Sequence, residues 1–161
     1  MNELSHERLS VSGIKNGTVI DHITPGQAFS IMQLLGLHAS EVKATVGLNL
    51  QSGRMGRKDL IKIEGRVLTD GEANEIVVFA PLATINVIEQ FKVVKKFNTH
   101  LPSTMRHVFK CPNPICITQT EVTDQLFHVR EQGKQIKLTC HFCEKEYERN
   151  EVIIHLSMST S

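Results

Sequence analysis

Four cysteines, the only ones in the chain, lie in two pairs toward its C-terminal end. Thiolates two to four residues apart fit on one tight turn, or knuckle, and two knuckles supply a tetrahedral set of sulfur ligands. Because the protein fills all four positions, such an ion is structural and has no open position for water. The spacing therefore predicts one structural zinc ion per chain. Its ligands would be Cys111, Cys116, Cys140 and Cys143.

Other interpretations of these cysteines stay open. Cys140 and Cys143 alone could form a redox dithiol, and cysteines at these spacings could be ordinary core residues. Iron accepts the same four-sulfur geometry. Two pairs together favour a metal, and in a reducing compartment they favour it over disulfides. Four histidines lie nearby and are interpreted as surface or second-layer groups: His107, His128, His141 and His155.

The segment between the knuckles alternates apolar and polar residues, with Val122, Leu126 and Val129 as candidate inward positions. Gly133 lies in a predicted hairpin turn, since glycine accepts a positive φ. This pattern predicts a small all-β zinc ribbon. From residue 102 onward seven Lys and Arg balance seven Asp and Glu, so four thiolates around one Zn²⁺ leave the segment mildly acidic. That balance disfavours nucleic acid and favours a role in docking another protein.

The composition as a whole excludes little else. The 161 residues carry a formal net charge of +1, which gives no global argument for a polyanionic partner. No apolar run approaches the roughly 20 residues that cross a bilayer. The N-terminus lacks the basic and then apolar layout of a secretory signal. A soluble, cytoplasmic protein without membrane contact is expected.

Two helix starts are marked in the first hundred residues. Thr24 to Gln27 and Thr69 to Glu72 both fit the capping box, in which a Thr side chain and a Gln or Glu side chain satisfy the first backbone N–H groups. Pro25 would take the first helical position, and Gly36 would end that helix. In the second helix, before Pro81, the predicted apolar face is Ala73, Ile76, Val77 and Ala80.

Strands are predicted over residues 17–23, 41–50, 58–67 and 83–94, which gives the order β-α-β-β-α-β. This order is typical of the ferredoxin-like split βαβ fold, an antiparallel sheet with two helices on one face. The fold class is therefore α+β, with the zinc ribbon second. The expected domains are residues 1–100 and 101–161, with a frayed tail from about residue 155.

Basic residues concentrate in two places of the first domain. One explanation is that lysines on edge strands prevent aggregation. The other is a site for a small polyanion, in which ammonium groups contact phosphates and a carboxylate contacts ribose. No Gly-rich phosphate-binding loop follows a strand and opens a helix, because the Gly-rich segment SGRMGRK lies between two predicted strands. The basic residues are Arg54, Arg57, Lys58 and Lys62 in one cluster and Lys92, Lys95 and Lys96 in the other.

The motifs GTVIDHI, GLNLQSGRMGRKDLIKIE, FAP and CPNPIC followed by CHFCEKE occur in one order along the chain. With them the chain resembles the regulatory chain of aspartate carbamoyltransferase from about Leu9 to about Ile154. The resemblance implies a non-catalytic subunit that forms a homodimer through its N-terminal domain. It also implies that CTP, often with UTP, inhibits and that ATP activates. The zinc domain would dock on the catalytic chain, which makes carbamoyl aspartate for pyrimidine biosynthesis.

Carried over residue by residue, the resemblance implies a nucleotide pocket with a base end and a phosphate end. The base would lie beside Val11, Ser12, Ile14 and Val19, with Ile88, Phe91 and Val93 completing the pocket and its rim. The ribose would contact Asp21 and Lys62, and the phosphates would contact His22 and Lys96, with Lys58 close by. Four residues depart from the family pattern: Ser12 replaces Glu, Phe91 replaces Tyr, Ile115 replaces a polar residue and Arg54 replaces an acid.

Two rival functions remain at this point. One is a sensor of a different small molecule, such as an amino acid, on the same split βαβ scaffold, because a fold alone does not determine its ligand. Such a sensor would not need clustered lysines. The other is a nucleic-acid-binding zinc ribbon, which the acidic balance of the ribbon disfavours.

Overall fold

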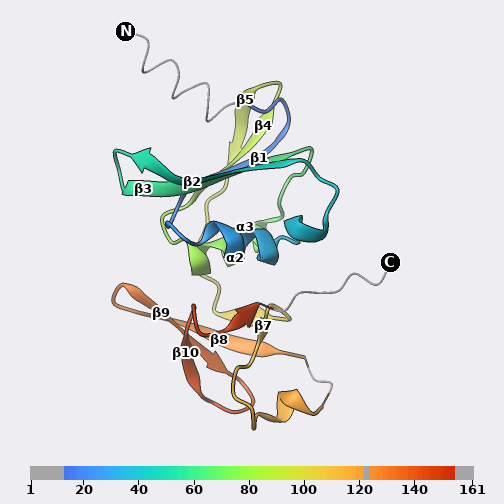
Figure 1. Cartoon of the computed structure of the whole chain (residues 1–161), viewed down its shortest axis with the longest axis vertical. Coiled ribbons are helices and arrows are strands. Elements are labelled where there is room, and N and C mark those ends of the chain that lie inside the picture. The colour runs from blue at the N-terminus through green and yellow to red at the C-terminus, as the bar shows by residue number, and fades with distance from the viewer. Residues whose placement is uncertain (1–12, 122–123, 155–161) are drawn as a thin grey trace. The chain divides into compact units, whose positions relative to one another are not determined.

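The computed structural model describes residues 13–121 and 124–154. These residues form two compact units that divide between Thr99 and His100 (Figure 1). Within the described ranges, no helix is both long and apolar enough to cross a membrane. The first unit contains β1 (Gly17–Ile23), α2 (Ala28–Leu34), the 3-10 helix η1 (Leu37–Ala39), β2 (Ala44–Ser52), β3 (Gly56–Glu64), α3 (Asp70–Phe79), β4 (Thr84–Glu89) and β5 (Lys92–Lys96).

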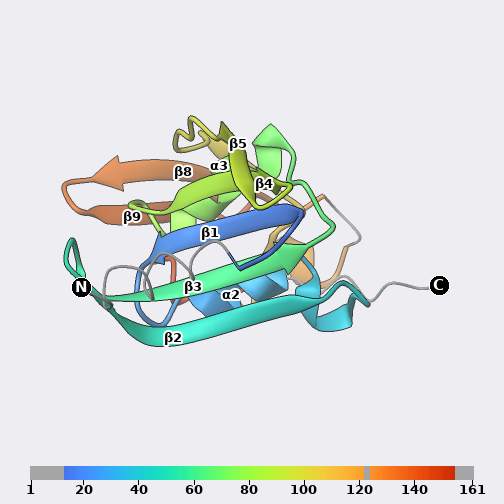
Figure 2. The same ribbon diagram turned by 90° about the horizontal axis from the view of Figure 1, so that it is seen from above.

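The strands of the first unit form one antiparallel sheet in the order β2-β3-β1-β4-β5. Figure 2 shows the strands in this order with α2 and α3 on one side of the sheet. The predicted β-α-β-β-α-β arrangement is therefore confirmed, with β5 added beside β4. The core between sheet and helices contains fully buried Ile20, Ile61, Ile63, Ile76, Phe79 and Ile85.

The start of α3 follows the sequence prediction. The Thr69 hydroxyl accepts a hydrogen bond from the Glu72 backbone N–H, and the Glu72 carboxylate accepts one from the Thr69 N–H. This reciprocal pair satisfies two backbone donors that would otherwise lack partners at the helix start. The predicted apolar face is buried as expected.

The start of α2 does not follow the prediction. The helix begins at Ala28, Gln27 is its N-cap, and no side chain of that residue caps it. Thr24 instead accepts the Gln27 N–H through its backbone carbonyl, and Pro25 lies in the turn before the helix. The capping box at Thr24 and the helical position of Pro25 were therefore wrong.

Asp59 of β3 supplies the missing cap from a distant part of the chain. The residue is 1% exposed, and its carboxylate accepts hydrogen bonds from the backbone N–H groups of Gly26 (3.0 Å), Ala28 (3.4 Å) and Asn49 (3.0 Å). Asn49 lies in an irregularity of β2, where its φ is 57°. One buried carboxylate thus ties β3 to the first turn of α2 and to β2.

The segment predicted as a single strand over residues 83–94 is a hairpin of β4 and β5. Gln90 and Phe91 form its turn, with φ values of 51° and 65°. Two consecutive positive φ values match a two-residue hairpin turn that usually carries Asn or Gly. The turn is held from outside, since Phe91 N–H donates to the Lys15 carbonyl and Gln90 N–H donates to the Asn16 side chain.

The second unit is all-β, as predicted. A four-stranded sheet has the order β10-β9-β8-β6, and β11 pairs with β7. The turn at Gly133 has a positive φ of 61°, which confirms the predicted hairpin. Its elements are β6 (Thr104–Arg106), β7 (Phe109–Lys110), the 3-10 helix η2 (Ile117–Gln119), β8 (Leu126–Gln132), β9 (Gln135–Cys140), β10 (Glu146–Glu148) and β11 (Ile153–Ile154).

The core of the second unit differs in part from the predicted inward positions. Phe127 is fully buried and packs edge-to-face on Phe109, with ring centroids 5.6 Å apart. Val129 is half-buried but shares the face of Phe127 and pairs with buried Leu138, so its inward position is confirmed. Leu126, next to Phe127 in the strand, faces the other side and is only half-buried, so its assignment as an inward position was wrong. Val122 lies outside the described residues, as does the tail from residue 155 that was expected to fray.

We predict that Asp59→Asn destabilises the first unit by about 1.5–3 kcal/mol, the range for hydrogen bonds to a charged group. The amide replaces one acceptor oxygen by a donor that faces backbone N–H groups. Urea unfolding of the first unit measures this loss. Glu89→Gln makes the same chemical change at an exposed strand end and should leave stability nearly unchanged. Equal midpoints for the two variants would contradict the role given to Asp59.

Candidate metal centre and effector face

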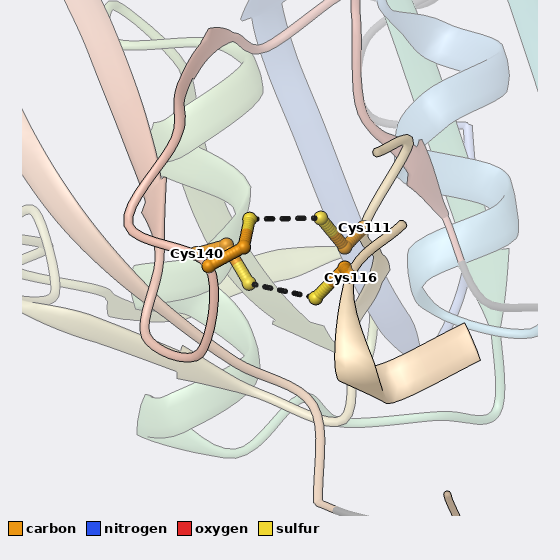
Figure 3. A group of neighbouring side chains, drawn as sticks. Cys111, Cys116 and Cys140 are labelled. Carbon is orange, nitrogen blue, oxygen red and sulfur yellow. Dashed lines mark hydrogen bonds between the residues drawn. The ribbon is translucent and has the colours of Figure 1, made fainter. Parts of the chain in front are cut away.

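The four cysteine sulfurs come together in the second unit. All four lie within 4.8 Å of one another, with Cys111 Sγ 3.7 Å from Cys143 Sγ and Cys116 Sγ 3.9 Å from Cys140 Sγ. In Figure 3 the sulfurs of Cys111 and Cys116, on the first knuckle, point toward the second knuckle at Cys140. Sulfurs about 2.3 Å from a central ion are about 3.8 Å apart in a tetrahedron. The residues therefore fit a tetrahedral metal ion.

The electrostatics of the thiols also favour a cation. Burial, followed by hydrogen bonding to neighbouring thiols, raises the pKa of Cys111 to about 12. Burial would also raise the pKa of Cys143, but hydrogen bonds from the Lys145 N–H and the Asn113 side chain lower it to about 7. Four thiolates so close together need a compensating positive charge. A bound metal cation would supply that charge.

Hydrogen bonds shape the first knuckle. The Gln119 side-chain amide donates to the carbonyls of Cys111 (2.6 Å) and Asn113 (3.0 Å). The Ile115 N–H donates to the buried Asn113 side chain at 3.2 Å. The Thr118 hydroxyl donates to Cys116 Sγ at 3.1 Å. Such contacts orient ligands and tune their affinity for the metal.

No histidine joins this ligand set. Across residues 13–121 and 124–154, the four cysteines are the only group of three or more potential metal ligands. His107, His128 and His141 are exposed, as expected for surface groups. His155 lies outside the described residues.

The predicted nucleotide residues lie mainly on the sheet face that the helices leave uncovered, which we call the effector face. Directly paired residues of neighbouring strands project to the same side of a sheet. Val19 pairs with Lys62 on one side and with Asn86 on the other, and Asn86 pairs with Lys96. Lys62 and Lys96 therefore flank Val19 and Asn86 on one face.

An apolar patch lies on this face. Ile14, Val19, Leu60 and Ile88 form one buried cluster. Three of these residues were selected from the sequence, whereas Leu60 was missed. The alternation of Lys58, Leu60 and Lys62 along β3 could have identified it, because residues two apart share a face.

The polar part of the effector face is built around Asp21. Lys58 Nζ lies 3.0 Å from Asp21 Oδ1, and these side chains are only 15% and 9% exposed. The Asp21 carboxylate also accepts the His22 N–H at 2.7 Å. Asp21 is thus paired with Lys58. Among the described residues, no hydrogen bond or ion pair joins Asp21 to Lys62 or to another lysine.

His22 lies beside Asp21 because β1 is irregular there. Neighbouring residues of a regular strand face opposite sides, but the pairing of β1 with β3 shifts between Ile20 and Ile23, and His22 has a φ of 56°. His22 Nδ1 lies 3.0 Å from the Thr84 hydroxyl. Burial lowers the pKa of His22, and nearby Lys58, Arg54 and Lys96 lower it further, while Asp21 opposes them.

The remaining predicted residues are more exposed or undescribed. Phe91 and Val93 are 57% and 59% exposed on the β4–β5 hairpin, and Val93 pairs with buried Ile88. Val11 and Ser12 lie outside the described residues. The structure thus groups Ile14, Val19 and Ile88, and separately Asp21, His22 and Lys58. Thr84 and Asn86 are further polar residues that sequence reasoning missed.

We predict that Thr118→Val weakens metal binding roughly 10–100-fold, the usual cost of losing a group that orients a ligand. Competition with a chromophoric chelator measures this affinity. Thr120→Val is the matched control, because the Thr120 hydroxyl donates to the Ile117 carbonyl and not to a sulfur. If both variants held the ion equally well, the hydrogen bond to Cys116 would have no role in metal binding.

Two family models together match nearly the whole chain. Residues 9–100 match the aspartate carbamoyltransferase regulatory chain, allosteric domain, and residues 103–153 match the aspartate carbamoyltransferase regulatory chain, metal binding domain. The first match contains the effector face, and the second contains the four cysteines.

Curated relatives agree with these models. An aspartate carbamoyltransferase regulatory chain of Aeromonas hydrophila is 46% identical over 87% of this chain and 91% of its own length. Those of Photorhabdus laumondii and Salmonella arizonae are each 44% identical, over 92% and 93% of this chain and 96% and 99% of their own lengths. This chain belongs to the aspartate carbamoyltransferase regulatory chain family.

Proposed function

We propose that this chain is the non-catalytic regulatory subunit of an aspartate carbamoyltransferase and binds nucleoside triphosphates on the effector face. CTP and UTP inhibit the catalytic chain and ATP activates it, as family resemblance implies. The observation that carries the proposal is the arrangement of the face, where an apolar patch lies beside an ionic group and two further lysines. Residues 1–100 would form the nucleotide-binding domain and residues 101–161 the domain that docks on the catalytic chain.

The two parts of the effector face suit the two parts of a nucleotide. Exposed Phe91 and Val93 would contact a base above the buried cluster of Ile14, Val19 and Ile88. Family resemblance adds Val11 and Ser12, which lie outside the described residues. Lys62 and Asp21 would contact the ribose, and His22, Lys96 and Lys58 would contact the phosphates. Ser12 and Phe91, where the family has Glu and Tyr, remove a carboxylate and a phenol and would alter base preference.

Lys58 has a particular role in this scheme. In the free chain its ammonium group is paired with Asp21. A triphosphate carries more negative charge than one carboxylate and would compete for that ammonium group. Lys58 is followed directly by Asp59, which faces the helices and holds α2 and β2. Movement of Lys58 toward phosphate would therefore shift Asp59 and its hydrogen bonds to α2 and β2 on the opposite side of β3.

The ion of the metal centre is proposed to be zinc, one per chain. Four thiolates in a tetrahedron suit zinc, and a closed set of ligands serves folding. Exposed apolar side chains around the knuckles, Ile115 (85% exposed), Ile117 (47%) and Phe142 (39%), would contact the catalytic chain. We place the assembly in the cytoplasm, where thiolates stay reduced.

The proposed homodimer would form along β2, at one end of the first unit's sheet. This nine-residue strand contains no charged residue and exposes Leu48 and Leu50. The strand at the opposite end, β5, carries three lysines among its five residues. Lysines on an edge strand oppose pairing, whereas an uncharged edge permits it. Two copies joined at β2 would continue one antiparallel sheet.

Regulation in this assembly would be allosteric, because the nucleotide and the reacting substrates lie on different chains. A nucleotide shifts two quaternary states only if it binds them with different affinity. Coupling free energies of this kind are typically about 1–3 kcal/mol, so half-saturation by aspartate should move several-fold. The metal-bound unit, stiffened by its ion, would transmit the change to the catalytic chain.

The function is tested by assembling the chain with a catalytic chain and measuring activity with each triphosphate. Lys62→Ala should weaken triphosphate binding by about 1.5–3 kcal/mol, as for the loss of a charge-assisted hydrogen bond. Calorimetry measures this loss, and zinc content and assembly should stay intact. Lys43→Ala, an exposed lysine beside Glu64, is the control. A wild-type isotherm for Lys62→Ala would reject the pocket, and an assembly that responds only to an amino acid would support the rival sensor.

A second prediction concerns pH. The pKa of His22 is below its ordinary value in the free chain, so the imidazole is neutral near pH 7. A bound triphosphate would raise that pKa, so binding takes up a proton and should strengthen between about pH 8 and about pH 6. His22→Asn should flatten this dependence while keeping the polar contact with Thr84, since Asn tolerates a positive φ. Equal pH slopes would exclude His22 from the phosphate end.

A third prediction concerns the homodimer. Leu48→Lys should shift the chain from dimer to monomer in light scattering, because paired strands would bring two added charges together. Val94→Lys adds the same charge at an equally exposed position of β5 and should leave the dimer intact. Dissociation by Val94→Lys alone would place the interface on β5 instead.

A further inference from the structure

Two histidines outside the four-cysteine centre are positioned to bind a metal ion. His128 lies in β8, and His141 directly follows Cys140 at the end of β9. Their ring nitrogens, His128 Nε2 and His141 Nδ1, are 2.9 Å apart and share a hydrogen bond, with the donor set by the tautomers of the rings. Both side chains are exposed, so an ion can reach them and water can complete its coordination.

The backbone holds these two residues in place. His128 pairs with Thr139 in the β8–β9 ladder, two residues before His141. The His141 N–H donates to the Leu126 carbonyl at 2.9 Å, which joins the second knuckle to the start of β8. The Phe142 ring packs edge-on against the His141 ring, with centroids 5.3 Å apart. The imidazoles therefore approach each other from anchored segments.

The nitrogen separation indicates the kind of ion. Imidazole nitrogens bind such ions at about 2.0–2.1 Å, so two ligands at a right angle lie about 2.9 Å apart and two at the tetrahedral angle about 3.4 Å apart. The observed spacing fits the right angle. Right-angled nitrogen ligands are typical of the square or tetragonal coordination of Cu²⁺ and Ni²⁺.

Charges of both signs share the face of β8 that carries His128: Arg106 and Lys137 project from it, and Lys137 is paired with Glu148. Arg130, two residues along β8, is paired with Glu146 at 2.6 Å. Glu146 pairs in register with Thr139, which pairs with His128, so its carboxylate projects from the same face of the sheet.

We propose that His128 Nε2 and His141 Nδ1 form a second metal site, on the surface of the second unit, for a divalent ion of the Cu²⁺ and Ni²⁺ class. Each nitrogen offers a lone pair when its ring carries its proton on the other nitrogen. The ion joins β8 to the second knuckle. This site is separate from the four cysteines and does not depend on the nucleotide function.

Nickel is the probe, added to metal-loaded full-length chain purified without a histidine tag. Equilibrium dialysis with elemental analysis should find one nickel ion per chain beside the ion already present. Bound nickel should also raise the unfolding temperature of the second unit. His128→Ala and His141→Ala should each lose the nickel at the concentration that saturates the wild type. His107→Ala, another exposed histidine of the same unit, should keep it.

His128→Asn separates metal binding from hydrogen bonding. Its amide can still hydrogen-bond His141 but is a poor ligand for nickel, so this variant should fold and bind no nickel. Wild-type nickel content in His128→Ala or His128→Asn would overturn the proposal. The proposal would also be overturned if nickel bound only as the original ion was released and gave the absorption bands of nickel thiolate. That nickel would occupy the cysteines.

Discussion

The first unit depends most on the hydrogen bonds that the buried Asp59 carboxylate accepts from three backbone N–H groups. This group is buried under the sheet, and a carboxylate in that environment requires donors. Three backbone N–H groups supply them, from the turn before α2, from the first residue of α2 and from the irregular part of β2. Since alternate residues of a strand face opposite sides, the same constraint sets Lys58 and Leu60 on the effector face. The position of one buried anion thus determines which side chains a ligand on the other face would meet.

The second unit also buries groups that can carry negative charge, but here they are thiols that need a metal cation instead of backbone N–H donors. Its described residues are too few to bury a large core, and its fully buried side chains include Met105, Phe109, Phe127 and Leu138. Four sulfurs within 4.8 Å of one another take up part of that interior. Without an ion, burial works against thiolates, as the raised pKa of Cys111 shows. With a divalent ion, the same burial strengthens the ligand bonds, so metal binding and folding become one process.

Local sequence signals predicted what local interactions determine. The capping box at Thr69, the turn at Gly133 and the grouping of cysteines all involve residues close in sequence or a known ligand spacing. The capping box at Thr24 failed because Asp59, more than thirty residues away, takes over the role of the cap. The β4–β5 turn was missed because Gln90 and Phe91 carry no turn signal, and contacts with Lys15 and Asn16 hold it. The ion pair of Lys58 with Asp21 and the position of His22 depend on an irregular strand pairing that no residue pattern announces.

β3 carries charged groups on both faces of the first unit's sheet. Lys58 and Asp59 are neighbours on it, and each is bound to a partner on its own side of the sheet. A ligand that drew Lys58 away from Asp21 would remove the ion pair that joins β3 to β1 at this point. The irregularities of β1 and β2 flank β3 at this point, so the strands there are held by side-chain contacts as well as by regular ladder bonds. Such a region would rearrange at lower cost than a regular sheet, which is a property that the proposed nucleotide site would use.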